Sequence, residues 1–432
     1  MNLPRRRFNT FQRAMLQWNF MHPYNAVHVV HIPGTHDLER LRLAINGTLE
    51  ARSLTGLTLV HEQGTYAYAG GPACCEIVVL KEVESLSACL SMEIERQLNT
   101  PFLQSGPFTP FRFFVAQCEG SFALGLAYLH AVADAQSIVL LLREIVAEYG
   151  GRNERNDRPA NHAGAPPRGN PLLFRPGVFV RKLTSVPALV RNMRSSCRPP
   201  YRNPSDLNNG FKIFRLQKED LRRLVETAKA WGITVNDLLL ALLMKSCALQ
   251  ASGRERARGR KKISVGCIVN TRREFSDEHQ GAFGLFLGSF VITHAVPAQV
   301  TLKELATDIG RATLDIKRKK LYLATAMELS FGRLMLSFFS EERRKRVYQK
   351  NYPLWGGLTN MNINSLWPSE KPMDYFRGVS TGPVTPLVLS FTTAGESANI
   401  GLSYRSTVFT AADIERLGRY FLDAVTDPEV AK

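Results

Sequence analysis

A histidine that follows a strand-like segment has the residue type and setting of a general base. His130 lies in YLHAVADAQS, just after the apolar stretch Ser121–Ala127, and Asp134 follows four residues later. A neutral imidazole can accept a proton from a hydroxyl or amine that attacks a carbonyl, and its ordinary pKa near 6.5 suits this task. Asp134 need not touch the ring, because an ion pair made by Asp134 would hold the turn and with it the imidazole. The HxxxD spacing alone leaves a structural histidine at a strand end as the alternative, because the chain contains nine histidines.

Alternating strand and helix patterns surround His130. In the first third, strands are predicted at Ala26–Ile32, Leu57–His61, Tyr66–Ala69, Glu76–Leu80, Phe111–Cys118 and Ser121–Ala127, and helices at Phe8–Phe20, Leu38–Ala51, Ser85–Leu98 and Ser137–Tyr149. Later strands are predicted at Gly210–Leu216, Ile263–Asn270, Val384–Thr393 and Ala398–Tyr404, and later helices from Lys218, over Leu238–Ala251 and from Thr410. Glu119–Gly120 is predicted to be a hairpin turn. Two α/β halves with helices covering their sheets follow from this pattern.

The length and one change in composition predict the domain organisation. A chain of 432 residues exceeds the size of a comfortable single core. Gly, Pro, Asn and Arg dominate residues 151–171, where no apolar periodicity survives, as is typical of a linker. We therefore expect an N-terminal lobe over 1–150 that carries HxxxD, a linker over 151–171, and a C-terminal lobe over 172–432.

The motif and its neighbours resemble one superfamily of acyltransferases. LHAVADA resembles the HHxxxDG signature shared by chloramphenicol acetyltransferase, peptide-synthetase condensation domains, plant BAHD acyltransferases and bacterial wax-ester synthases, with Leu129 in place of the first His and Ala135 in place of the Gly. NTPFLQSGPFTPFR (Asn99–Arg112) is similar to a condensation-domain segment, and Val265–Pro297 resembles the second-half pattern of that family. LTNMNINSLWP and TAADIERLGRYF match its closing layout. The resemblance spans nearly the whole chain in the family's order.

This resemblance implies a fold, an activity and roles for particular residues. The fold would be α/β, with two chloramphenicol acetyltransferase-like lobes, each a mixed sheet with flanking helices, and an active-site tunnel at the lobe interface. His130 would be the base in acyl transfer from a thioester to a hydroxyl or amine. Asp134 would be the structural aspartate, paired with Arg272, whose alternative is a solvated charge at a strand end. Three polar residues would bind the acceptor or donate to an oxyanion, or else lie at a strand edge: Thr359, Asn360 and Asn362.

The sequence leaves the choice between two thioester donors open. Acyl-CoA is the expected donor, and a carrier-protein thioester, as for a stand-alone condensation enzyme, is the alternative. A non-catalytic binding protein that kept the fold is a second alternative, which Ala135 favours. We expect no permanently bound cofactor and no metal, because the sequence contains no HExxH, CxxC or GxxxxGK[ST] pattern.

The charge of the chain indicates anionic partners. The net charge is +17 and the sequence pI is about 9.7. The basic, partly apolar segments Phe174–Arg202 and Arg311–Lys350 suit a membrane surface, a CoA diphosphate or an acidic carrier protein, or are ordinary solvated helices. They also favour a small-molecule or lipid-like acceptor. No motif indicates nucleic acid. Seven cysteines without a CxxC pair and the lack of a signal-peptide pattern predict a cytoplasmic protein, with peripheral membrane contact as an option.

Overall fold

The computed structural model describes residues 5–81, 85–151, 176–251, 253–254, 258–275, 280–367 and 374–427. Except for residue 151, the predicted linker 151–171 lies outside the described residues. The chain divides into two compact units. Unit 1 comprises Met1–Asn170, Asn270–Leu287 and Asn362–Val379, and unit 2 comprises Pro171–Val269, Gly288–Met361 and Ser380–Lys432.

The expected lobes are continuous in sequence, whereas the compact units are not. Two stretches from the second half of the chain belong to unit 1. One contains β12 (Tyr375–Val379), which pairs antiparallel with β2 (Asn25–Pro33). The other, 270–287, is held by hydrogen bonds and an ion pair near the start of α4 (Ala135–Tyr149). Strand pairing and a buried ion pair therefore bring these stretches into unit 1, and neither follows from composition.

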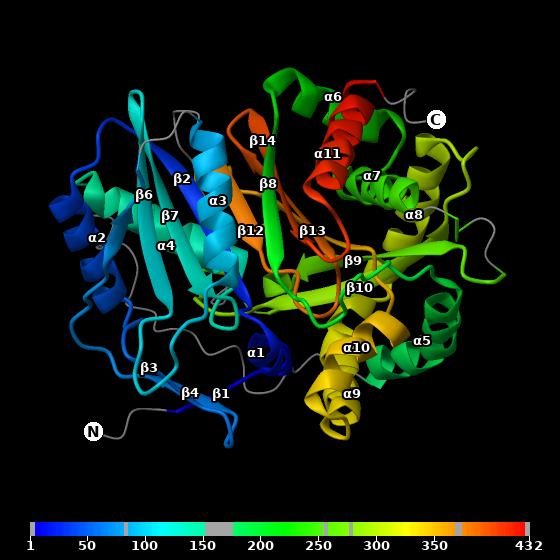
Figure 1. Cartoon of the computed structure of the whole chain (residues 1–432), viewed down its shortest axis with the longest axis horizontal. Helices are drawn as coiled ribbons and strands as arrows, with labels where there is room; N and C mark the ends of the chain where they lie inside the picture. The colour runs from blue at the N-terminus through cyan, green and yellow to red at the C-terminus, as the bar shows by residue number, and fades with distance from the viewer. Residues whose placement is uncertain are drawn as a thin grey trace. The chain divides into compact units, whose positions relative to one another are not determined.

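A five-stranded sheet forms the centre of unit 1 (Figure 1), in the order β12-β2-β7-β6-β5. Its remaining strands are β5 (Ile77–Val79), β6 (Phe111–Cys118) and β7 (Ser121–Leu129). A small sheet holds β1 (Arg6–Arg7), β4 (Thr65–Tyr68) and β3 (Leu57–Val60). The helices are α1 (Thr10–Met21), α2 (Leu38–Ala51), α3 (Leu86–Asn99), α4 and the short 3₁₀ helix η3 (Arg272–Glu274). The strands and helices predicted for this part of the chain are confirmed, with shifts of at most two residues at their ends.

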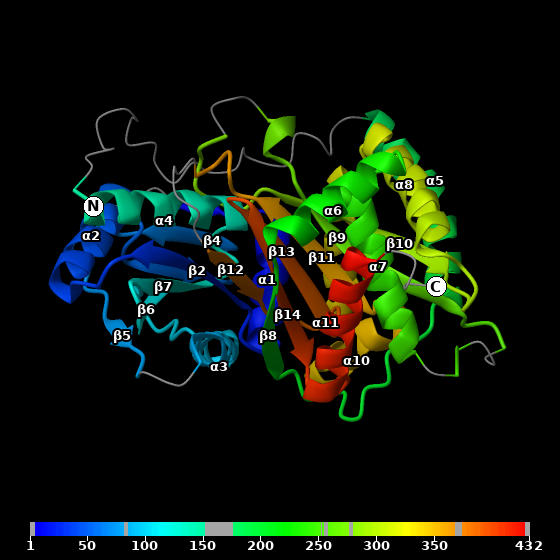
Figure 2. The same ribbon diagram turned by 90° about the horizontal axis from the view of Figure 1, so that it is seen from above.

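Helices cover both faces of this sheet, with α4 on one face and α3 on the other (Figure 2). On the α3 side, Arg112 of β6 donates hydrogen bonds to the carbonyl oxygens of Gln97 and Thr100 at the end of α3. On the α4 side, Phe122 of β7 contacts Tyr149 of α4, with ring centroids 5.7 Å apart. Because side chains alternate along a strand, Tyr128 lies on the same face of β7 as Phe122. The strand thus leads toward His130 along the face that α4 covers.

The hairpin that joins β6 to β7 depends on one glycine, and its pairing depends on another. Gly120 has φ +66°, a conformation that residues with a Cβ rarely adopt, which confirms the predicted turn. Gly125 of β7 lies opposite Phe114, and a Cβ at Gly125 would lie 2.0 Å from the Phe114 ring. Any larger residue at 125 would displace that ring from the core.

Unit 2 contains a six-stranded sheet in the order β10-β9-β11-β13-β14-β8. The strands are β8 (Asn209–Leu216), β9 (Lys262–Asn270), β10 (Leu287–Ala295), β11 (Gly356–Asn362), β13 (Leu387–Ala394) and β14 (Ser397–Arg405). The helices are α5 (Pro176–Ser195), α6 (Lys218–Ala230), α7 (Val235–Gln250), α8 (Leu302–Arg318), η5 (Leu321–Ala324), α9 (Thr325–Ser337), α10 (Glu341–Asn351) and α11 (Ala411–Thr426). β14 and β8 pack against α6, and α11 packs against β8, α6 and α7. The α/β class with mixed sheets and flanking helices is confirmed.

The most apolar helix of unit 2 is an internal one. Every residue of α7 from Asp237 to Ala248 is buried, as the all-round apolar pattern predicts. Among the described residues, no single helix combines the length and hydropathy of a membrane span. α6 and α7 meet these criteria only when taken together, across a bend of 103°.

Candidate active site

His130 is buried directly after β7, between two tyrosine rings. Its backbone N–H donates a hydrogen bond to the carbonyl oxygen of Tyr24, 3.1 Å away, which fixes the main chain at this point. The imidazole stacks on Tyr24, with ring centroids 5.6 Å apart. It makes a T-shaped contact with Tyr128, with centroids 5.7 Å apart and ring planes at 85°. Only 7% of the residue is exposed. The ring is therefore held in one orientation by its neighbours.

One hydrogen bond determines which nitrogen of His130 can act as a base. Nδ1 lies 3.1 Å from the carbonyl oxygen of Ala133. A carbonyl oxygen can only accept, so the hydrogen must reside on Nδ1. In the neutral ring, Nε2 then carries the free lone pair, and none of the described hydrogen bonds involves Nε2. His130 is thus arranged as a proton acceptor at Nε2.

The surroundings keep this imidazole neutral. Burial lowers the pKa of His130 to about 4, because a charged ring would lose its hydration. The carbonyl of Ala133 and the negative charge of Asp134 act in the opposite direction, and the positive charge of Arg377 lowers the pKa further. At pH 7 the ring is therefore neutral.

Asp134 holds the end of the HxxxD loop. It is the N-cap of α4, and its Oδ1 accepts a hydrogen bond from the Ser137 N–H at 3.0 Å. Its Oδ2 accepts from Arg272 Nη1 at 2.6 Å and from the Phe286 N–H at 2.9 Å. Its own N–H donates to the carbonyl oxygen of Gly284. The carboxylate thus joins α4 to the 270–287 segment.

Arg272 is the partner that was predicted for Asp134, and the structure contains this ion pair. Arg272 is 1% exposed, so the alternative of a solvated charge is wrong. Its Nη2 donates to Ser137 Oγ at 2.8 Å and to the Ala282 carbonyl oxygen at 3.2 Å. Its guanidinium also lies over the Phe286 ring, 4.4 Å from the centroid. These contacts orient the arginine rigidly.

Three buried residues, His28, Tyr375 and Arg377, were not assigned to the site from the sequence. His28 of β2 places Nδ1 2.8 Å from the hydroxyl of Tyr375 in β12, and Arg377 of β12 lies opposite His28 in the strand register. Burial, followed by the charges of Arg377 and His130, lowers the pKa of His28. The fully buried Arg377 has its pKa lowered to about 10, chiefly by burial. DYFRGV is too short and too interrupted to predict a strand, so no local signal placed Arg377 beside His28.

The three remaining predicted site residues, Thr359, Asn360 and Asn362, all lie in β11. Asn360 and Asn362 are exposed on one face, as strand alternation predicts, and Thr359 lies on the other. Asn362 Oδ1 accepts a hydrogen bond from the Asn364 N–H. Thr359 and Asn360 belong to unit 2 and Asn362 belongs to unit 1. Their roles toward a substrate stay predictions.

The two residues that differ from the HHxxxDG signature, Leu129 and Ala135, lie at the end of β7 and at the start of α4. Leu129 is fully buried at the end of β7, where it pairs with Asn25. Ala135 is half-buried as the first residue of α4.

Within the described residues, no group of three or more His, Cys, Asp or Glu side chains could hold a metal ion.

Comparisons with known proteins identify the fold. No protein-family model and no curated protein match the chain. Trichothecene 15-O-acetyltransferase TRI3 from Fusarium sporotrichioides aligns over 99% of this chain and 95% of its own, with a TM-score of 0.71 and 12% identity. The first condensation domain of the calcium-dependent antibiotic synthetase aligns over 99% and 97%, with a TM-score of 0.69 and 15% identity. A chain from the complex of the X-domain and OxyB from teicoplanin biosynthesis aligns over 99% and 95%, with a TM-score of 0.59 and 15% identity.

The chain therefore has the fold of the condensation domain and of the TRI3 acetyltransferase, which is the fold that the motifs predicted. All of these similarities extend over nearly the full length of both chains. At 12–15% identity, these similarities show the fold and not the reaction.

Proposed function

We propose that this chain transfers an acyl group from a thioester to a hydroxyl or amine, with His130 as the general base. The observation that carries the proposal is the tautomer of His130. Its Nδ1–H is committed to the Ala133 carbonyl oxygen, and its pKa is lowered to about 4, which leaves Nε2 unprotonated at neutral pH. The shared fold with an acetyltransferase and a condensation domain supports the same reaction class.

The proposed reaction needs no covalent acyl-enzyme. Nε2 of His130 takes the proton of the acceptor hydroxyl or amine as the acceptor oxygen or nitrogen bonds to the thioester carbonyl carbon. The tetrahedral intermediate then expels the thiolate, which takes the proton from Nε2. During these steps the Ala133 carbonyl oxygen and the charge of Asp134 stabilise the imidazolium, since both favour its protonated form. Asp134 acts through the loop and its charge, and Arg272 positions Asp134.

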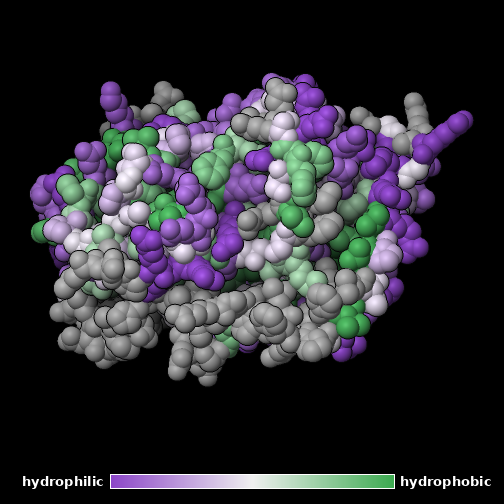
Figure 3. Space-filling view, turned by 90° about the horizontal axis from the view of Figure 1, so that it is seen from below, coloured by the Kyte–Doolittle hydropathy of each residue, from purple (hydrophilic) through white to green (hydrophobic). Residues whose placement is uncertain are grey.

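Acyl-CoA is the proposed donor. A net charge of +17 favours an anionic co-substrate, and CoA carries several phosphate charges. A carrier-protein thioester is the alternative donor, which the resemblance to a condensation domain supports equally. Hydrophilic and hydrophobic residues are mixed on the face in Figure 3. The basic, partly apolar segments Phe174–Arg202 and Arg311–Lys350 support a lipid-like acceptor and a cytoplasmic protein with peripheral membrane contact.

A non-catalytic binding role is the rival from another class. The X-domain that shares this fold forms a complex with OxyB, so the fold also occurs in a protein that binds another protein. Ala135 in place of glycine supports this reading. The presence of both His130 and Asp134 of the motif argues against it.

Release of free thiol measures the proposed reaction. Wild-type protein is incubated with short- and long-chain acyl-CoAs and a pool of alcohols and amines. Release that requires both an acceptor and His130 is expected, and His130→Ala should lower the rate by roughly 10² or more. His61→Ala, which removes an exposed histidine, is the matched control and should retain the wild-type rate. Equal rates in wild type and His130→Ala would remove His130 from the mechanism, and silence with both acyl-CoA and carrier-protein thioesters would favour the binding role.

A further inference from the structure

Buried polar side chains on three neighbouring strands of unit 1 lie together on one face of the sheet. His28 of β2 is paired on one side with Arg377 of β12 and on the other with Leu126 of β7. Paired residues of antiparallel strands share a face and side chains alternate along each strand, so His28, Tyr375 and Tyr128 lie on the same face. Each of these three residues is 0% exposed. They lie on the face that α4 covers (Figure 2).

The rings on this face touch one another in a continuous row that ends at the candidate base. His130 and Tyr128 make a T-shaped contact, with ring centroids 5.7 Å apart. Tyr128 makes a second such contact with His28, also at 5.7 Å, and His28 makes a third with Tyr375 at 5.6 Å. Trp367 contacts Tyr375 at the far end of the row, at 6.2 Å. Because a protein interior is close-packed, a tilt of one ring forces its neighbour to move as well.

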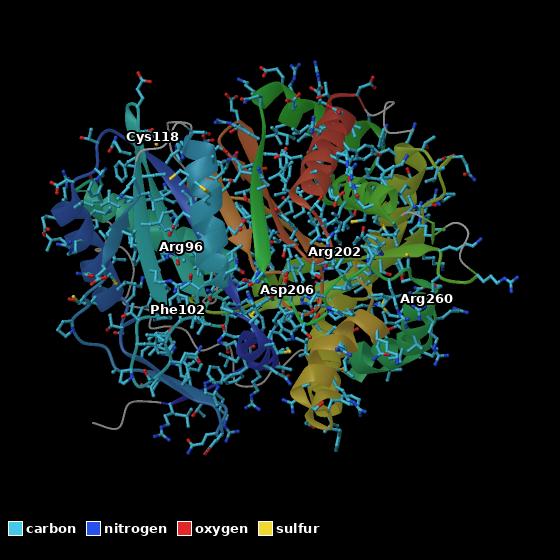
Figure 4. The ribbon with its side chains drawn as sticks, in the orientation of Figure 1. Arg96, Phe102, Cys118, Arg202, Asp206 and Arg260 are labelled. Carbon is cyan, nitrogen blue, oxygen red and sulfur yellow. The ribbon has the colours of Figure 1, made fainter. Side chains whose placement is uncertain are left out.

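The opposite face of the sheet, which α3 covers, treats its polar side chains differently. The guanidinium of Arg112 lies over the ring of Phe102, 4.0 Å from the centroid, and donates to the Thr100 carbonyl oxygen. Arg112 is half-buried and Arg96 of α3 is exposed, and both Phe102 and Arg96 are labelled in Figure 4. These arginines keep contact with water. The fully buried polar side chains on the α4 side depend on partners within the protein.

One hydrogen bond orients the row at His28. Its Nδ1 lies 2.8 Å from the Tyr375 hydroxyl oxygen. His28 Nε2 is buried and has no hydrogen-bond partner among the described residues, so the bond to Tyr375 is the one that orients the imidazole. Burial keeps both groups neutral, because it lowers the pKa of His28 and raises the pKa of Tyr375. A hydrogen-bonded pair in the interior specifies one ring orientation, whereas an apolar side chain would only fill the space.

We propose that His28 and Tyr375 are positioning residues for His130, and that they act on it through the ring of Tyr128. The proposal rests on the proposed function, in which Nε2 of His130 must point at the acceptor. The Ala133 carbonyl oxygen fixes the hydrogen on Nδ1, and the Tyr128 ring restricts the tilt of the imidazole. Misplacement of a reacting group by about 1 Å can cost about 10²-fold in rate. His28 thus contributes to the reaction without contact with a substrate.

Nitrogen NMR of the histidine rings tests this positioning without any enzyme assay. The full chain is prepared with isotopically labelled histidine, and the His130 signals are identified by their loss in His130→Ala. Wild type should show His130 with its hydrogen on Nδ1. Tyr375→Phe keeps the aromatic ring but removes the hydroxyl, so the His130 signals should broaden or shift toward a mixture of the two tautomers. Tyr149→Phe, which removes a phenol that accepts from the Asp37 N–H in the same unit, is the matched control and should leave the His130 signals unchanged.

Kinetics with acyl-CoA adds a readout that separates positioning from stability. Tyr375→Phe should lower kcat about tenfold or more with KM unchanged, since the base is misplaced while substrate binding remains. His28→Asn can still form a hydrogen bond with Tyr375 but has no ring to restrain Tyr128, so it should produce the same changes. Tyr149→Phe should keep the wild-type kcat.

The melting temperature Tm of each variant is measured in parallel, and His28→Asn supplies the comparison if Tyr375→Phe does not fold. A lower Tm with unchanged His130 signals and unchanged kcat would mean that the pair is only structural, which overturns the proposal. Unchanged His130 signals in both variants also overturn it, and changed signals with an unchanged kcat overturn the role in catalysis. If wild type transfers no acyl group, the proposed function fails, but the NMR comparison still decides whether His28 and Tyr375 position the ring.

Discussion

The protonation state of His130 depends on groups that the HxxxD motif does not contain. Burial has the largest effect and favours the neutral ring. Arg377 adds to this effect from β12, and its charge also reaches His28. Asp134 acts in the opposite sense, so the pair of charges sets how readily Nε2 takes a proton. The strength of the base is thus a property of a buried cluster of residues.

This balance predicts the acid limb of the pH dependence of kcat/KM. The neutral form of His130 is the active one, and its pKa is about 4, so activity should fall only as the pH drops through about 4. An unperturbed histidine would place that fall near 6.5. Arg377→Met removes the cation that lowers this pKa, so the limb should move to higher pH. Because burial remains, the limb should stay below 6.5.

Arg377→Lys is the matched control for this experiment, since it retains the positive charge. Its acid limb should lie close to that of wild type. An unchanged limb in Arg377→Met would mean that Arg377 does not influence the base. A wild-type limb near 6.5 would contradict the neutral, buried state of His130.

At the scale of elements, the start of α4 is the point where separate parts of unit 1 are joined. The Asp134 carboxylate caps α4 and accepts from Arg272 and from the Phe286 backbone. Ser137 Oγ adds hydrogen bonds with both the N–H and the carbonyl oxygen of Gly284. The loop that carries His130 ends at this junction, so its geometry depends on the junction being intact.

Removal of Asp134 should therefore destabilise the fold as well as slow the reaction. Asp134→Ala leaves the Arg272 charge buried without its partner, which costs about 3–5 kcal/mol in the free energy of unfolding. The double variant with Arg272→Met should recover much of this loss, because the buried charge is then absent. Asp315→Ala breaks an exposed pair with Lys319 and should cost less than about 1 kcal/mol. Urea unfolding measures all three, and an unaltered midpoint for Asp134→Ala would contradict the structural role.

Local patterns predicted the elements well, and distant pairings explain what they missed. The β6–β7 hairpin joins neighbouring segments, so turn chemistry at Gly120 was enough to predict it. Arg272 was assigned to Asp134 through the family resemblance, since spacing alone cannot pair residues so far apart in the chain. Tyr375 and Arg377 owe their positions to the pairing of β12 with β2. No periodicity in a single segment reports such a pairing.

For the whole molecule, the excess of positive charge is concentrated in part on helices that also expose apolar side chains. In unit 2, both α5 and α9 pack against η5. Val180 of α5 is 56% exposed, Leu334 of α9 is 58% exposed, and Phe338, which follows α9, is 77% exposed. Exposed basic residues lie on the same helices or on α10: Arg181, Arg191, Arg194, Arg343, Arg346 and Lys350. Apolar anchors beside basic side chains are typical of contact with an anionic membrane surface.

Binding to liposomes separates this interpretation from that of ordinary solvated helices. The protein should co-sediment with vesicles that contain phosphatidylserine, and binding should weaken as salt rises, because the Debye length falls from about 10 Å at 0.1 M to about 3 Å at 1 M. Phe338→Ser should weaken binding even at low salt, since it removes an apolar anchor. Phe20→Ser, which alters an exposed phenylalanine of unit 1, is the matched control and should bind like wild type. The absence of binding at low salt, or equal binding to neutral phosphatidylcholine vesicles, would mean that the charge on these helices is simply solvated.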